Sequence, residues 1–210
     1  LREQNWFLNS KIKEPDLMDV LDLVSLGTVC DVVPLVDLNR AMVHQGLKIL
    51  KRKKNLGLKT LIEVSNIENN ITPYHLGYIL GPRINAGGRV GKSTHGANLL
   101  LNENPKNSFK LANELNMYNK ERQILETQLL EKILNTDYEN SMDPVIVLYG
   151  ENWHEGIIGI IASRVKEKFK KPTIIISVNK GVGKGSGRSI QGFDLGSTII
   201  GAVQNGLLDK

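Results

Sequence analysis

The most regular pattern of apolar and polar positions lies between residues 104 and 134. Apolar residues recur there at spacings of three, four or seven, with charged residues on either side: Leu111, Leu115, Tyr118, Leu125, Leu129 and Ile133. This spacing places them on one face of an α-helix, and Asn104 followed by Pro105 is a typical helix start. At 1.5 Å per residue the helix would be about 45 Å long, too long for one small domain to enclose. The pattern therefore predicts a long helix that connects two lobes.

Shorter apolar periodicities before this helix predict further helices, at residues 16–26, 39–50, 60–64, 73–80 and 95–101. Gly27 is expected to end the first of them, and residues 6–8 are expected to be a short strand end. Residues 81–89 contain three glycines and a proline, so the sequence predicts irregular structure there.

Beyond the long helix the pattern changes to a β-α-β unit. Residues 145–149 and 173–178 are short apolar runs typical of buried strands, and the isoleucines and valine of residues 157–165 have helical spacing. The two strands are expected to be parallel, with a right-handed crossover between them. Residues 181–187 are predicted to form a glycine-rich turn. The expected fold is α/β with two lobes, divided near residues 136–143.

Composition narrows the class of protein without identifying it. The chain has 210 residues, enough for one large or two small domains, and a net charge of +5 that suits a polyanionic partner. Its one cysteine, Cys30, excludes an internal disulfide and fits a reducing cytoplasm. No apolar run is long enough to predict a membrane span, and no leader peptide is recognisable. Because residue 1 is Leu, we expect the chain to be a piece of a longer protein.

Two aspartates are candidates for binding a metal ion. Asp31 lies within the apolar run of residues 26–35, where a carboxylate is costly unless it binds a cation or accepts hydrogen bonds. It could equally cap a turn before Pro34. Asp22 is a second candidate, although it could also be an ordinary acidic residue on the exposed face of a helix. The four histidines have no ligand spacing, so the residues alone do not build a metal site.

The stretch of residues 81–89 is a candidate anion-binding loop. Glycines let backbone amides approach an anion, and one arginine side chain can bind two phosphate oxygens at once. The candidate residues are therefore Arg83, Asn85 and Arg89. An irregular loop held by arginine–carboxylate pairs is the structural alternative. Residues 86–93 also match a relaxed phosphate-loop pattern that would use Lys92, but the buried strand that this motif requires is not predicted before it.

A second candidate anion site lies at residues 184–189. Its small residues expose the backbone, its hydroxyl groups can donate hydrogen bonds, and two cations supply charge; the members are Lys184, Ser186, Arg188 and Ser189. A tight turn in a basic protein is the structural alternative. His154 precedes a predicted helix start and could face a phosphate, or could be a packed loop histidine.

Four of these stretches occur in the order and spacing of one family. Residues 26–35, 81–89, 153–160 and 184–190 resemble the RecJ family of single-strand-specific DNA exonucleases, within the DHH phosphoesterase superfamily. The resemblance implies an α/β nuclease with the C-terminal part of a DHH domain at residues 1–103, a connecting helix at 104–136 and a DHHA1 domain at 137–210. It also implies Mn²⁺- or Mg²⁺-dependent removal of nucleotides from the 5′ end of single-stranded DNA in repair and recombination.

The resemblance assigns roles to individual residues. Asp31 matches the acidic residue of the family's fourth motif and is expected to be a metal ligand, with Asp22 as the alternative. The expected nucleic-acid-binding or phosphate-binding residues are Arg83, Asn85, Arg89, His154, Lys184, Ser186, Arg188 and Ser189. The aspartate-rich motifs and the Asp-His-His motif are absent, so we expect the chain on its own to be inactive. The alternatives are a DHH-family phosphodiesterase for short oligonucleotides or dinucleotides, a non-catalytic nucleic-acid-binding module and a phosphate-loop hydrolase.

Overall fold

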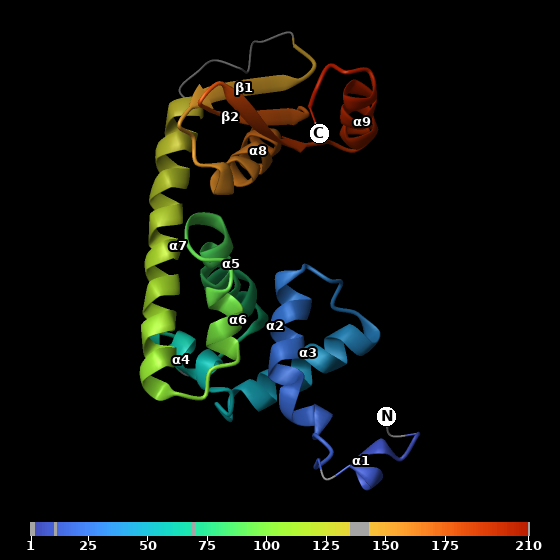
Figure 1. The fold of residues 1–210 in the computed structure, drawn as a ribbon, viewed down its shortest axis with the longest axis vertical. Helices are drawn as coiled ribbons and strands as arrows, with labels where there is room; N and C mark the ends of the chain where they lie inside the picture. The colour runs from blue at the N-terminus through green and yellow to red at the C-terminus, as the bar shows by residue number, and fades with distance from the viewer. Residues whose placement is uncertain (1–2, 11, 69, 135–142, 210) are drawn as a thin grey trace. The chain divides into compact units, whose positions relative to one another are not determined.

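The chain divides into two compact units. The computed structural model describes residues 3–10, 12–68, 70–134 and 143–209. Unit 1 consists of residues 1–85 and 94–116, and unit 2 of residues 86–93 and 117–210. Two helices, α5 (Gly81–Val90) and α7 (Pro105–Leu134), contribute residues to both units (Figure 1). The lobe boundary expected near residues 136–143 lies, apart from Asp143, outside the described residues.

Unit 1 is helical throughout its described secondary structure. Besides parts of α5 and α7 it contains α1 (Trp6–Asn9), the short 3₁₀ helix η1 (Leu17–Val20), α2 (Leu21–Cys30), α3 (Asp37–Leu50), α4 (Leu56–Val64), the π-helix η2 (His75–Leu80) and α6 (His95–Leu100). Helices α2 and α3 lie side by side (Figure 1). Their approach is close, because a Cβ atom at Gly46 would overlap the Leu21 carbonyl oxygen.

Three expectations for unit 1 and for α5, which contributes residues to both units, were wrong. The predicted strand end at residues 6–8 is part of helix α1, and Gly27 lies inside α2 rather than ending it. Residues 81–89 are helical, because Pro82 occupies the first turn of α5, where a missing N–H removes no intrahelical bond. The other helices predicted in this unit are present, with shifted ends.

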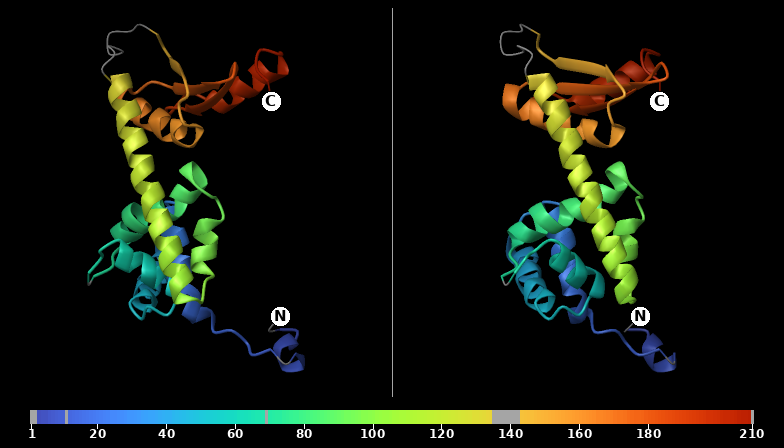
Figure 2. Two further views of the ribbon diagram at one scale, coloured as in Figure 1. Left: turned by 60° about the vertical axis from the view of Figure 1, so that its left-hand side comes forward. Right: turned by 90° about the vertical axis from the view of Figure 1, so that its left-hand side faces the viewer.

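Unit 2 contains the predicted β-α-β arrangement. Strand β1 (Ile146–Glu151) pairs in parallel with β2 (Thr173–Asn179), and Ile146 lies opposite Thr173. The crossover between them is α8 (Glu155–Phe169), which contacts the sheet through β2 and β3 (Figure 2). The chain then forms β3 (Val182–Arg188) and α9 (Leu195–Gln204), the latter not foreseen from the sequence.

The glycine-rich turn predicted at residues 181–187 is instead mostly strand. Strand β3 is antiparallel to β2, with Gly185 opposite Ile176 and Gly187 opposite Ile174. Glycine has a low intrinsic preference for strands. Here the backbone hydrogen bonds to β2 hold these residues in a strand nevertheless. The tight turn itself lies between β2 and β3, at Lys180 and Gly181, which both have positive φ.

The core of unit 2 lies between α7, α8 and the sheet. Its buried residues are Leu129, Ile133, Ile146, Leu148, Ile157, Ile158, Ile161, Ala162, Val165 and Ile175. Helix α7 is continuous over its 30 residues, as its apolar pattern predicted (Figure 2). Among the described helices, none combines the length and apolar character that a membrane crossing requires.

Candidate phosphate-binding site

Unit 2 has a pocket lined by three arginines from different elements. Arg89 comes from the end of α5, Arg164 from α8 and Arg188 from the end of β3. The cavity has a volume of about 270 Å³, and its other lining residues are Gly159, Ile160, Ser163 and Glu167. Three guanidinium groups against one carboxylate leave this lining with a positive charge. The pocket is therefore suited to an anion.

Hydrogen bonds fix the side chain of Arg188 within the pocket. Its Nε donates to Ser163 Oγ at 3.1 Å, and its Nη1 donates to Ser186 Oγ at 3.2 Å and to the Gly187 carbonyl at 2.7 Å. A Cβ atom at Gly159 would lie 3.0 Å from Arg188 Nη2. The absence of a side chain at Gly159 thus keeps space open beside this guanidinium group.

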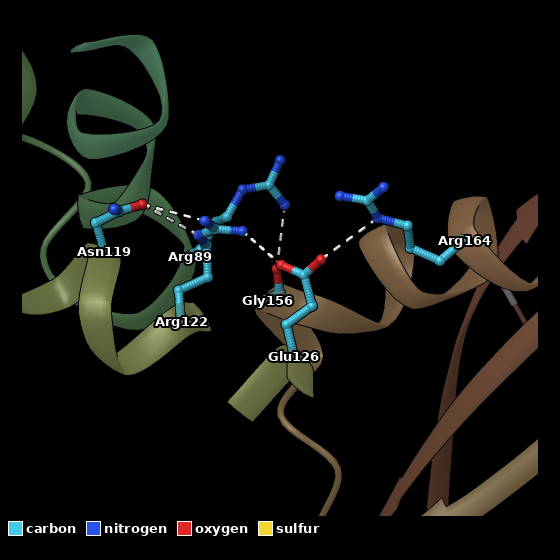
Figure 3. Close-up of polar contacts among 6 residues, drawn as sticks. All are labelled: Arg89, Asn119, Arg122, Glu126, Gly156 and Arg164. Carbon is cyan, nitrogen blue, oxygen red and sulfur yellow. Dashed lines mark hydrogen bonds and ion pairs between the residues drawn. The ribbon is translucent and has the colours of Figure 1, made fainter. Parts of the chain in front are cut away.

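Arg89 is held at the pocket by the start of α8. Its Nη1 donates to the Gly156 carbonyl oxygen at 3.1 Å (Figure 3). The two backbones are close, because a Cβ atom at Gly156 would overlap the Arg89 carbonyl oxygen. Burial lowers the pKa of the Arg89 guanidinium; repulsion by Arg122 and Arg188 lowers it too, while Glu126 opposes the change. Arginine nevertheless stays charged at neutral pH.

An acid on α7 links the pocket's Arg164 to one further arginine, Arg122. Glu126 Oε2 is 2.6 Å from Arg122 Nη1, and Glu126 Oε1 is 3.6 Å from Arg164 Nε (Figure 3). Arg122 also donates from Nε and Nη2 to Asn119 Oδ1, at 3.3 and 3.2 Å. Helices α5, α7 and α8 thus each contribute charged groups to one cluster.

Several residues predicted to bind phosphate lie outside the pocket lining. His154 caps α8, and its Nδ1 accepts a hydrogen bond from the Gly156 N–H. Lys184 is exposed and pairs with Glu155 at 3.0 Å. The Ser189 hydroxyl donates to the carbonyl oxygens of Ile190 and Phe193. Ser186 contributes through its contact with Arg188.

Of the three residues predicted in the stretch of residues 81–89, Arg89 alone lines the pocket. Arg83 belongs to unit 1, where its Nε donates to Asn116 Oδ1 at 3.0 Å and its Nη1 to the Ile79 carbonyl at 2.8 Å. Burial lowers the pKa of Arg83. The contact with Asn116 ties α5 to α7 within unit 1, and the contact with Ile79 ties α5 to η2. Asn85 is exposed on the same helix.

The two candidate metal ligands have different surroundings. Asp31 is exposed at the C-terminal end of α2, whereas Asp22 is 3% exposed within it. Asp22 Oδ1 accepts a hydrogen bond from the Leu23 N–H at 2.8 Å, and burial raises the pKa of its carboxyl group. Within the described ranges no group of three or more His, Cys, Asp or Glu side chains could hold an ion. Asp22 could supply one ligand, but the described residues do not make a complete metal site.

The phosphate-loop alternative lacks its structural context. Lys92 closely follows α5, and the described residues before α5 form the π-helix η2 rather than a buried strand. The loop that would wrap phosphates is therefore replaced by helix over residues 86–90.

The sequence interpretation missed most of the charged cluster around Glu126. Arg122 and Glu126 were assigned only as charged flanks of the long helix, although their spacing of four residues predicts a pair. Arg164 and Ser163 had no sequence signal of their own, because their positions depend on how α8 packs beside α7.

Comparison with known proteins agrees with this architecture. Residues 142–206 match the DHHA1 domain. Curated relatives described as single-stranded-DNA-specific exonuclease RecJ include those of Escherichia coli (strain K12), 41% identical over 203 residues, and Bacillus subtilis (strain 168), 36% identical over 181 residues. These matches cover 93% and 84% of this chain. The chain spans 35% and 23% of the length of these two relatives.

Solved structures give the same result. Crystal structures of RecJ from Thermus thermophilus in complex with Mg²⁺ and with Mn²⁺ match with a TM-score of 0.82 each, at 30% and 31% identity. Both matches cover 98% of this chain, and respectively 32% and 30% of those chains. The α/β fold with its long helix is thereby confirmed. The chain is similar to the RecJ exonucleases over nearly all of its own length, and its residues 142–206 match the DHHA1 domain.

Proposed function

We propose that this chain is part of a RecJ-type exonuclease that hydrolyses phosphodiester bonds of single-stranded DNA from the 5′ end, in DNA repair and recombination. We also propose that the arginine pocket of unit 2 holds a phosphate group of that DNA. The observation that carries the proposal is the convergence of Arg89, Arg164 and Arg188 on one open cavity. The names of the relatives supply the substrate class.

The pocket's contribution would be to bind and orient the strand. Arginine suits this task because its planar guanidinium group donates two parallel hydrogen bonds to phosphate oxygens. Arg188 is already oriented by Ser163 and Ser186, so less conformational freedom is lost when a phosphate binds. A phosphate fixed here would determine which phosphodiester bond the rest of the protein can reach.

The metal chemistry would depend on residues that the described part of the chain does not supply. In the proposed enzyme Mn²⁺ or Mg²⁺ would activate water and stabilise charge on the scissile phosphate. Asp22 is the better candidate ligand on burial, since an ionised buried carboxylate is costly without a partner cation. We therefore favour Asp22 over Asp31 and expect the 210-residue chain alone to be inactive. A single cysteine is consistent with a cytoplasmic protein.

Binding of a fluorescent, 5′-phosphorylated single-stranded oligonucleotide to the 210-residue chain tests the proposal. Arg188→Ala should weaken binding at least tenfold, which is about 1.4 kcal/mol. It should also reduce the salt dependence of binding by about one unit of slope or less. Arg40→Ala removes an exposed arginine of α3 and is the matched control, with an expected change below twofold.

Competitors separate this function from the alternatives. Preference for the single strand over the matching duplex, lost in Arg188→Ala, supports the proposal. Competition by a dinucleotide as strong as that by a long strand would favour the phosphodiesterase alternative. Binding that Arg188→Ala and Arg40→Ala weaken equally would reject the pocket as the phosphate site.

A further inference from the structure

We propose that Glu126 is an internal counter-ion of the arginine pocket: its carboxylate balances the arginines while no ligand is bound, and this limits the pocket's affinity for anions. The inference rests on the proposed phosphate-binding function. It assigns a role to a residue that itself does not line the pocket. Glu126 would act through Arg164, whose guanidinium group its carboxylate faces.

The geometry of Glu126 is that of a shared partner. Its side chain is 14% exposed, so its charge is little screened by water. One carboxylate oxygen contacts Arg122 and the other faces Arg164, so the carboxylate lies between an arginine of its own helix and one of α8 (Figure 3). Arg89 lies close enough for Glu126 to influence its ionisation.

The two arginine contacts of Glu126 differ in strength. Arg122 is 13% exposed, its 2.6 Å contact is a short charged hydrogen bond, and buried Asn119 binds the rest of its guanidinium group. Arg164 is 59% exposed and lies 3.6 Å away, beyond normal hydrogen-bond distance. The contact with Arg122 is therefore a fixed support, whereas the contact with Arg164 is the one that an incoming anion can replace.

A simple structural ion pair would behave differently from a counter-ion. Loss of a structural pair lowers stability by the same amount whatever anion is present. Loss of a counter-ion leaves the arginines mutually repelling, so the protein becomes less stable without a ligand and binds an anion more tightly. Dependence of stability on the anion is thus the property that separates the two roles.

Inorganic sulfate is a suitable probe because its charge is constant across neutral pH. Binding is measured by calorimetry, and thermal unfolding is followed in sulfate and in chloride at equal ionic strength. Glu126→Gln should bind sulfate about threefold to fivefold more tightly than the unaltered chain, the range expected for one partly exposed ion pair. Its unfolding midpoint should be lower in chloride and recover in sulfate. Glu131→Gln removes an exposed acid from the same helix and should change affinity less than twofold.

Unchanged or weaker sulfate binding by Glu126→Gln would overturn the inference. If this variant does not fold, nuclear magnetic resonance of the unaltered chain decides: sulfate should shift the Nε–H signal of Arg164 and leave that of Arg122 in place. Equal shifts, or none, would contradict the proposed role. Arg188-dependent DNA binding that persists in such a case would show that only the counter-ion inference has failed. Loss of all anion and DNA binding in the unaltered chain would instead reject the proposed function.

Discussion

Unit 1 and unit 2 arrange their charged groups in opposite ways. Unit 1 buries one carboxylate, that of Asp22, whose described hydrogen bond comes from the neighbouring Leu23 N–H. Unit 2 gathers arginines around a cavity and places Glu126 among them. In one unit an acidic group is enclosed; in the other, positive charges are partly balanced and remain accessible to solvent.

The difference bears on the kind of ligand that we expect each unit to bind. A buried acid without a described cationic partner costs stability, and a bound cation would remove that cost. The arginine pocket differs, because Arg188 is already oriented by Ser163 and Ser186 within unit 2. We therefore expect unit 2 to bind anions in the 210-residue chain. We expect unit 1 to bind a metal ion only when further ligands complete the site.

The largest expected effect comes from breaking the core that supports the pocket. Leu129→Ala should lower the free energy of unfolding by about 2–5 kcal/mol, because Leu129 is 7% exposed within the core of unit 2. Urea denaturation followed by tryptophan fluorescence measures it. Thr127→Ala, exposed on the same helix, should cost less than about 0.5 kcal/mol. Equal costs would mean that α7 does not support the core.

The contact that brings Arg89 to α8 can be broken separately. Gly156→Ala places a methyl group against the Arg89 carbonyl, so the backbones must separate, at a cost of about 1–3 kcal/mol. Sulfate binding should weaken as Arg89 moves. Gly88→Ala is the control: it meets no atom within 4 Å and should stabilise α5 by up to about 1 kcal/mol. A Gly156→Ala protein as stable as Gly88→Ala would exclude close packing here.

Filling the pocket tests whether its space matters as well as its charge. Gly159→Leu removes no arginine but occupies the room beside Arg188, so sulfate affinity should fall about tenfold, or about 1.4 kcal/mol. Gly159→Ala adds one carbon near a side chain that can shift and should have a smaller effect. Calorimetric titration of both variants checks the order. Undiminished binding by Gly159→Leu would place the anion elsewhere.

The smallest effect concerns the buried acid of unit 1. Because burial raises the pKa of Asp22, the folded chain holds this proton more readily than the unfolded chain. Stability therefore falls as pH rises from about 3.9, the ordinary value, through the raised value. Asp22→Asn should stabilise the chain by about 1 kcal/mol at pH 7, the low end of the cost of a poorly paired buried polar group.

The pH series supplies the control for this prediction. The advantage of Asp22→Asn should vanish below about pH 3.9, where the carboxyl group is protonated in both states. Asp31→Asn, at an exposed position, should change stability by less than about 0.5 kcal/mol at either pH. Thermal unfolding at pH 7 and at low pH measures both variants. An Asp22→Asn protein less stable than the parent at pH 7 would mean that the carboxylate has a stabilising partner.

Sequence patterns predicted the elements whose signals are local. The apolar pattern of α7 and the apolar runs of β1 and β2 predicted these elements correctly. In each of them the buried residues recur along the element itself, so a local stretch of sequence contains the signal. The helix at residues 81–90 was missed because glycine and proline were treated as breakers, whereas Pro82 lies in a first turn. Strand β3 was missed because its stability comes from pairing with β2, which lies outside any local window.

The candidate site was predictable to the extent that it lies in recognisable motifs. Arg89 and Arg188 were both singled out, although nothing in the sequence indicated that they share a pocket. Glu126 and Arg164 come from helices that meet only in the fold, so their pairing is a tertiary property. Lys184 and His154 were plausible by residue type, but local contacts with Glu155 and Gly156 engage them.

Strand β3 carries a further consequence for the chain in concentrated solution. Within the described sheet it pairs with β2 on one side only, and its alternating glycines leave the backbone of the other side little shielded. Such an edge is a template for joining a strand from another molecule. Lys184 and Arg188 place like charges along it and repel a second copy. Solutes that screen these charges would weaken this protection against aggregation together with the pocket's attraction for anions.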